Sequence, residues 1–240
     1  MFRTFYVASK FIWDLALLTP RKMKLERLQK EGNIKESADL ISITTNKWAK
    51  QIIQSSGVEI EAIGLENIPD GPVVFVSNHQ GYFDIPVLFS LIDKPASFIA
   101  KKELGTIPIF GKWMELTRCI FIDRGNKRQS LQAIKDGIAL LKEGHSLVIF
   151  PEGTRSKSSD MKDFKKGSLK LATKAKVPIV PVCIDGTYKV FEANNGKKIT
   201  PAKVKVTFCD PIFTDNITKE EDALLNDKVE GTVRKNLLSN

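Results

Sequence analysis

The strongest constraint on the fold is a series of seven short apolar segments, rich in β-branched residues, that begins after Gly57. They cover residues 58–63, 73–77, 97–100, 120–122, 147–150, 179–184 and 203–208. Helical patterns lie between several of them, at residues 85–92, 130–141 and 168–175. Strands that alternate with helices predict an α/β fold, with helices on both faces of a mixed, largely parallel sheet. We therefore assign residues 58–240 to one α/β domain.

Residues 1–57 show a different, purely helical pattern. Over residues 2–18, Arg3, Lys10 and Asp14 share one narrow stripe, and large apolar side chains cover the remaining surface. Pro20 is expected to end this helix. A second helix is predicted over residues 37–56, with Gly57 as its terminating residue. This two-helix motif can pack on the domain as a hairpin, but its aromatic and basic composition favours a position in a bilayer interface.

The net charge is +9, which favours an anionic partner such as nucleic acid, a phosphorylated metabolite or an acidic membrane surface. Residues 1–30 hold seven basic and two acidic side chains, a net charge of +5, which indicates that this end binds a surface. There is no run of eighteen apolar residues to span a membrane. The cysteines are odd in number and widely spaced, which argues against a disulfide framework or a zinc site and favours a reducing, cytoplasmic compartment. They are Cys119, Cys183 and Cys209.

The most informative polar residues follow the apolar segment 73–77. There His79 stands at the expected end of a strand, and Asp84 stands at the start of the next predicted helix. If the two converge, the carboxylate accepts a hydrogen bond from one imidazole nitrogen and leaves the other free as a general base. The alternative is a structural hydrogen bond. His145, the second histidine, has no patterned partner and is interpreted as structural.

Two arginines follow other predicted strands. In Phe-Pro-Glu-Gly-Thr-Arg, which ends at Arg155, Pro151 and Gly153 predict a tight turn that directs N–H groups and the guanidinium toward one spot, a suitable cradle for phosphate. Arg124 follows the segment 120–122. Alone, either arginine would more often be a surface residue in an ion pair.

Together, His79-x-x-x-x-Asp84, Arg124 after a strand and the Phe-Pro-Glu-Gly-Thr-Arg155 motif resemble the glycerolipid acyltransferase family in residue type, order and separation. The resemblance covers about residues 60–187. Further blocks that resemble the family are Lys101-Lys-Glu-Leu, Ile107-Pro-Ile-Phe-Gly and Val177-Pro-Ile-Val-Pro. The chain departs from the family at Gly81, where members often have serine, and at Arg118-Cys119, where many have a glycine.

The resemblance implies transfer of a fatty acyl group from a thioester, acyl-CoA or acyl carrier protein, to the free hydroxyl of 1-acylglycerol-3-phosphate, which gives phosphatidate for phospholipid synthesis. By this likeness His79 deprotonates the hydroxyl while Asp84 orients the imidazole, with no acyl-enzyme. Arg124 and Arg155 would hold the acceptor phosphate. The resemblance also suggests Lys101 and the N–H of Gly153 as oxyanion donors, with Glu152 and Thr154 as supporting residues.

No metal and no cofactor are expected. The expected partners are the thioester donor, lysophosphatidate and an anionic membrane surface bound through residues 1–30, with no nucleic acid. This places the protein at the cytoplasmic face of the cell membrane as a peripheral or monotopic protein. Within the same chemistry, glycerol-3-phosphate or another lyso-lipid is the alternative acceptor. A non-catalytic basic protein that binds anionic membranes or nucleic acid is the alternative from a different class.

Overall fold

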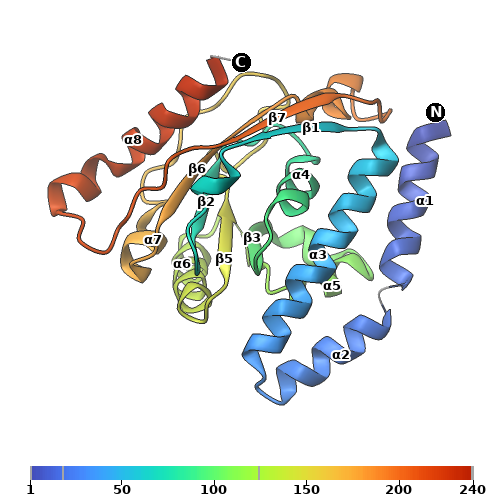
Figure 1. The fold of residues 1–240 in the computed structure, drawn as a ribbon, viewed down its shortest axis with the longest axis horizontal. Helices are drawn as coiled ribbons and strands as arrows, with labels where there is room; N and C mark the ends of the chain where they lie inside the picture. The colour runs from blue at the N-terminus through green and yellow to red at the C-terminus, as the bar shows by residue number, and fades with distance from the viewer. Residues whose placement is uncertain (1, 18, 124, 239–240) are drawn as a thin grey trace.

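The computed structural model describes residues 2–17, 19–123 and 125–238, in which seven strands form one sheet in the order β1-β7-β6-β2-β5-β3-β4 (Figure 1). All neighbouring strands are parallel except β6 and β7, which are antiparallel. This confirms the predicted mixed, largely parallel sheet. The strands are β1 (Glu59–Ile63), β2 (Val74–Ser77), β3 (Ala96–Lys101), β4 (Ile120–Ile122), β5 (Ser146–Ile149), β6 (Ile179–Asp185) and β7 (Lys203–Phe208).

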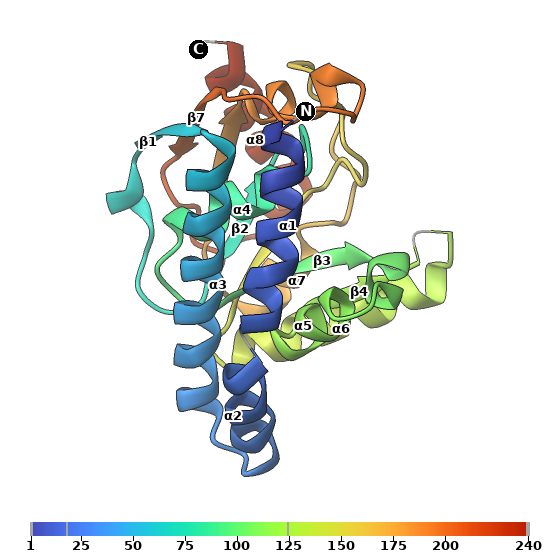
Figure 2. The same cartoon turned by 90° about the vertical axis from the view of Figure 1, so that its right-hand side faces the viewer.

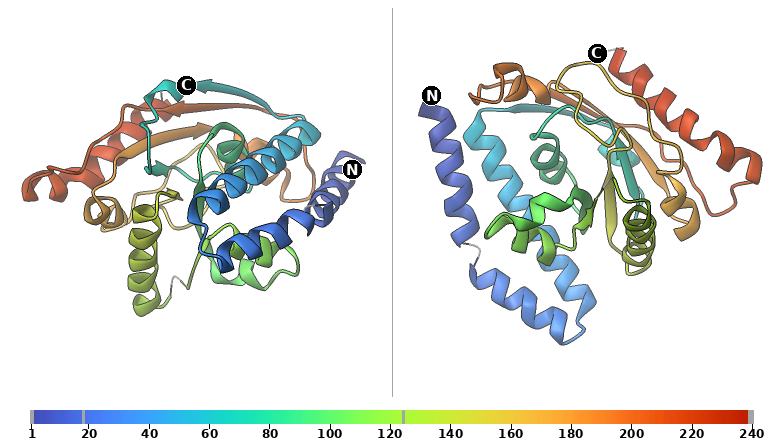
Figure 3. Two further views of the ribbon diagram at one scale, coloured as in Figure 1. Left: turned by 60° about the horizontal axis from the view of Figure 1, so that its bottom comes forward. Right: turned by 180° about the vertical axis from the view of Figure 1, so that it is seen from behind.

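Helices cover both faces of the sheet, as the alternating sequence pattern predicts (Figures 1 and 3). The α-helices are α1 (Phe2–Leu17), α2 (Thr19–Lys30), α3 (Ile34–Ser56), α4 (Asp84–Leu91), α5 (Phe110–Leu116), α6 (Lys127–Lys142), α7 (Lys170–Ala175) and α8 (Lys219–Leu238). Short 3-10 helices are η1 (Leu65–Asn67), η2 (Lys102–Thr106), η3 (Thr187–Lys189) and η4 (Glu192–Asn194).

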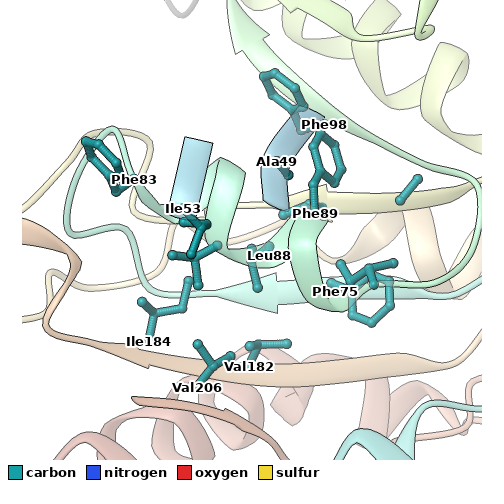
Figure 4. Packing of buried hydrophobic residues seen from close by; sticks show 14 of the residues in the cluster. Ala49, Ile53, Phe75, Phe83, Leu88, Phe89, Phe98, Val182, Ile184 and Val206 are labelled. Carbon is teal, nitrogen blue, oxygen red and sulfur yellow. The ribbon is translucent and has the colours of Figure 1, made fainter. Parts of the chain in front are cut away.

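Alternate residues of the central strands enter two separate cores. Phe75 of β2 and Val182 of β6 pack with residues of α3 and α4, among them Ala49 and Leu88 (Figure 4). Val74 points to the opposite face and packs with residues of α6, α7 and α8. Because β2 and β5 are buried along their whole length, their sequences are apolar except for Ser77 and Ser146, as is typical of parallel strands covered on both sides.

The N-terminal region contains three helices instead of the expected two, because the basic connection is itself the helix α2. Helix α1 ends at Leu17, just before Pro20, as expected, and Pro20 is the second residue of α2. Proline is tolerated in a first helical turn, where the backbone N–H has no intrahelical partner. Gly57 ends α3 with a φ of 75° and donates its N–H to Gln54 O, which confirms its predicted role.

Helix α1 runs beside α3 (Figure 2). It buries Val7 and Leu15 but leaves several large apolar side chains exposed. Its expected polar stripe instead reaches the protein: Asp14 is buried and pairs with Lys10 at 2.9 Å, and Arg3 donates to the Ser56 carbonyl. The exposed large apolar side chains of α1 are Phe2, Phe5, Tyr6, Ile12, Trp13 and Leu17. Within the described ranges, no helix is long and apolar enough to cross a membrane.

The ring of His145 is buried just before β5, and neither ring nitrogen has a hydrogen-bond partner among the described residues. Burial, reinforced by the nearby charge of Arg118, lowers the pKa of this imidazole to about 4. An unfolded histidine titrates near ~6.5. Between these two values the unfolded chain binds a proton that the folded protein does not, so protonation favours unfolding.

We therefore expect the free energy of unfolding to fall by about 3 kcal/mol from this residue alone as the pH drops from about 6.5 to about 4. Urea denaturation of the wild type and of His145→Leu at a series of pH values measures this fall in the free energy of unfolding. The variant should lose this part of the pH dependence. If the free energy of unfolding depends on pH in the same way in both proteins, His145 is not a buried neutral group.

Candidate active site

The carboxyl ends of three neighbouring strands bring the polar residues together. Strand β2 pairs with β5 on one side and β6 on the other, both parallel to it. Parallel strands end at the same edge of a sheet, and ligand sites in α/β folds lie there. The segments that leave this edge are residues 78–84 after β2, residues 150–156 after β5 and residues 186–192 after β6.

His79 and Asp84 are joined by a hydrogen bond of 2.6 Å between Nδ1 and Oδ2. Asp84 is fully buried as the first residue of α4, so the spacing of five brings the two side chains together in the way the sequence predicts. The His79 ring stacks on Phe150, with 4.0 Å between ring centroids. Asp84 therefore holds one edge of the imidazole through Nδ1, and Phe150 packs against one face of the ring.

Both oxygens of Asp84 have hydrogen-bond donors in addition to His79. The N–H of Gly81 donates to Oδ2 at 3.0 Å, and the Thr187 hydroxyl donates to Oδ1. The Gln80 side-chain oxygen accepts from the N–H of Gly186 at 2.9 Å and lies 3.3 Å from the Thr187 hydroxyl oxygen. A buried carboxylate with this many donors keeps a fixed orientation. Sequence reasoning missed Thr187 because it lies about a hundred residues from Asp84.

Glu152 fixes the backbone beneath the imidazole. One of its oxygens accepts from the N–H of His79 at 2.6 Å, and the other accepts from the N–H of Lys162 at 3.0 Å. The side chain is buried, and this burial raises the pKa of its carboxyl, against the lowering effect of the two N–H donors. The contact supplies a physical role for Glu152 in positioning His79, which the sequence alone left open.

Arg155 lies beside this pair and is partly exposed. Its Cζ is 3.6 Å above the centre of the Tyr82 ring, and its Nη1 donates to Oε1 of Glu192 at 3.0 Å. Glu192 is absent from the sequence predictions, because it lies in a polar loop beyond the recognised motifs. The same oxygen accepts from the N–H of Tyr82 at 2.8 Å.

The remaining predicted residues are more scattered. Lys101 ends β3 with a side chain that is 62% exposed and paired with Glu103. The N–H of Gly153 donates to the Phe150 carbonyl, so it already has an acceptor within the turn. Thr154 is exposed. Arg124 lies outside the described residues. The structure does not join Lys101 or Gly153 to the histidine, and their oxyanion roles stay predictions.

An apolar groove of about 400 Å³ lies next to the site. It joins α1 and α3 to the loops that carry the polar residues. Its lining residues are Val7, Ala8, Phe11, Trp48, Ile52, Tyr82, Phe83, Pro86, Phe191 and Ile199. In the part of the chain that the structure describes, no group of three or more His, Cys, Asp or Glu residues is arranged to hold a metal ion. The site therefore combines a partly buried histidine paired with a fully buried carboxylate, one arginine and an adjacent apolar groove.

The curated proteins to which this chain is similar include several named 1-acyl-sn-glycerol-3-phosphate acyltransferase. A 1-acyl-sn-glycerol-3-phosphate acyltransferase from Chlamydomonas reinhardtii is 39% identical over 150 residues, which are 62% of this chain and 45% of that protein. The enzyme of the same name from Saccharomyces cerevisiae is 32% identical over 176 residues, 72% of this chain and 58% of that protein. A probable one from Mycoplasma genitalium is 37% identical over 163 residues, 63% of this chain and 60% of that protein.

The chain thus spans about half the length of the curated relatives it matches. Among solved structures, the 1-acyl-sn-glycerophosphate (LPA) acyltransferase PlsC from Thermotoga maritima is similar with a TM-score of 0.74 at 28% identity, over 93% of this chain and 95% of that one. The family described as Acyltransferase matches residues 59–185, which include β1 to β6 and the histidine–aspartate pair. Because this match covers more than half of the sequence, the chain belongs to the acyltransferase family.

Proposed function

We propose that the protein transfers a fatty acyl group from a thioester to the free hydroxyl of 1-acylglycerol-3-phosphate and so produces phosphatidate. The observation that carries the proposal is the 2.6 Å contact between His79 and Asp84, at the same sheet edge as Arg155. Relatives named for this reaction, from organisms as distant as an alga, a yeast and a mycoplasma, support it.

The geometry accounts for the reaction without an acyl-enzyme. His79 Nε2 takes the proton of the acceptor hydroxyl as its oxygen forms a bond to the thioester carbonyl carbon. Asp84 stabilises the resulting imidazolium through Nδ1. The tetrahedral intermediate then breaks its carbon–sulfur bond, and the leaving thiolate takes the proton back from His79. A thioester is already activated, so correct placement of the two reactants supplies much of the acceleration.

The acceptor phosphate is assigned to Arg155, whose guanidinium matches a phosphate in charge and geometry. Arg124 stays the second predicted phosphate ligand. The apolar groove beneath α1 has the character required for a fatty acyl chain, since only apolar side chains and the Tyr82 ring line it. Because Tyr82 and Phe83 border both the groove and the polar site, one lipid can reach both.

The N-terminal helices are proposed to hold the protein on an anionic membrane, as a peripheral or monotopic protein at the cytoplasmic face. Helix α1 buries Val7 and Leu15 against the protein, yet leaves an outer face of exposed aromatic and aliphatic side chains. Helix α2 follows α1 along the chain and contributes basic residues, which an anionic surface attracts. The lipid substrate would then enter the groove directly from the bilayer.

Acyl transfer to lysophosphatidate tests the function. Purified protein is incubated with lysophosphatidate or glycerol-3-phosphate, each with acyl-CoA or acyl carrier protein as donor. We expect turnover of lysophosphatidate, and a loss of kcat of about 10²–10⁴-fold in His79→Ala because the general base is removed. His145→Leu, which replaces the second histidine away from the site, is the matched control and should keep its turnover.

Three outcomes would contradict this account. A preference for glycerol-3-phosphate would identify the alternative acceptor. Normal turnover by folded His79→Ala would exclude the general base. Salt-dependent binding to membranes or nucleic acid with no transfer to any acceptor would indicate the non-catalytic basic protein.

Membrane attachment is tested by removing the exposed aromatic residues of α1. The double variant Phe5→Ser/Trp13→Ser is compared with Phe213→Ser/Leu224→Ser, which removes similarly exposed side chains from α8 and the segment before it. Helix α8 lies far from α1 (Figure 1). Loss of about 1.5–3 kcal/mol per large apolar side chain predicts at least tenfold weaker partition for the first variant only. Cosedimentation with phosphatidylcholine vesicles containing phosphatidylglycerol measures it, and equal partition of both variants would refute the role of α1.

A further inference from the structure

Glu192 connects two loops of the site from a position outside the family match at residues 59–185. It begins η4 with a side chain that is only 4% exposed. Its Oε1 accepts from the N–H of Tyr82 at 2.8 Å and from Arg155 Nη1 at 3.0 Å. One carboxylate oxygen thus joins the loop after β2 to the loop after β5.

These contacts fix the Arg155 guanidinium on two sides. The Tyr82 ring lies 3.6 Å below Cζ, and Glu192 holds Nη1 at the edge. A guanidinium carries five N–H donors in a rigid plane. The ion pair engages one nitrogen, which leaves other donors of the plane for a ligand. Because the Arg155 side chain is already fixed, a phosphate that binds it does not have to immobilise it. Phosphate binding is therefore stronger.

Gly81 provides the space that Glu192 needs. A Cβ at residue 81 would lie 2.5 Å from Glu192 Oε2 and 2.8 Å from its Cδ, closer than non-bonded atoms approach. The backbone of Gly81 lies outside the left-handed region, so its conformation does not itself require glycine. A side chain at residue 81 would therefore require the Glu192 carboxylate to move from its observed position.

We propose that Glu192 is a positioning residue of the acceptor site, which holds Arg155 against Tyr82 in the orientation that takes the acceptor phosphate, and that Gly81 is required to accommodate it. The inference rests on the proposed function, because it takes Arg155 as the phosphate ligand. In this proposal, Glu192 affects acceptor binding only through Arg155. It does not contact the reacting atoms.

The test is steady-state acyl transfer to lysophosphatidate by the full-length protein. Glu192→Ala should raise the KM for lysophosphatidate about tenfold, with kcat and the donor KM within about twofold of wild type. Glu192→Gln keeps an oxygen for both N–H donors and should restore most of the affinity. A role limited to holding the fold together would instead change the unfolding midpoint, or kcat and both KM values together.

Two double variants test whether Glu192 changes the KM for lysophosphatidate through Arg155. In an Arg155→Ala background, Glu192→Ala should raise the KM no further, because the residue it positions is gone. Gly81→Ser should raise the KM in the wild type, since its Cβ displaces the carboxylate, but should add little in the Glu192→Ala background. Additive effects in both pairs would overturn the proposal.

The wild type separates this inference from the proposed function. If wild-type protein transfers no acyl group to lysophosphatidate, the function is wrong. If it does and Glu192→Ala leaves the acceptor KM unchanged, the function stands and the positioning role is wrong. Circular dichroism establishes that each variant is folded. Should Glu192→Ala not fold, Gly81→Ser carries the same test, and an unchanged acceptor KM in that variant overturns the proposal.

Discussion

The site depends on the pairing of β2 between β5 and β6, both parallel to it. This pairing places three strand ends, from distant parts of the chain, at one edge of the sheet. His79, Arg155 and Thr187 each follow a different one of these strands. The apolar strands that hold this edge in place pack against helices on both faces. The core therefore determines the positions from which the polar loops begin.

Buried carboxylates then set the positions of the polar groups. Asp84 orients the imidazole, Glu152 holds the backbone N–H of His79, and Glu192 holds Arg155. Each is nearly or fully enclosed and accepts two or more hydrogen bonds, so fixed donors offset part of the desolvation of the charge, although burial still raises the pKa of Glu152 and of Glu192. Three carboxylates from three loops thus preorganise His79 and Arg155. The phosphate and the hydroxyl of one lysophosphatidate molecule are proposed to bind between these two side chains.

Sequence patterns predicted the regular elements well, since each strand is a short β-branched run and each is close to its observed bounds. The helix α2 was missed because its polar, basic sequence was interpreted as a connection after Pro20, although a first helical turn accepts proline. Local motifs located His79, Asp84 and Arg155. Glu192 and Thr187 were not predictable, because their partners lie 37 to 110 residues away and sequence alone does not show which loops meet. Gly81 was recognised as a departure from the family pattern, but the sequence did not show that the Glu192 side chain lies against it.

The central claim is that one lysophosphatidate molecule binds between Arg155 and His79. A crystal structure of the protein with lysophosphatidate, in the absence of a thioester donor, tests it most directly. The account predicts phosphate oxygens within hydrogen-bond distance of the Arg155 guanidinium and the free hydroxyl about 3 Å from His79 Nε2. A phosphate bound away from Arg155, or a hydroxyl that does not reach the imidazole, would contradict it.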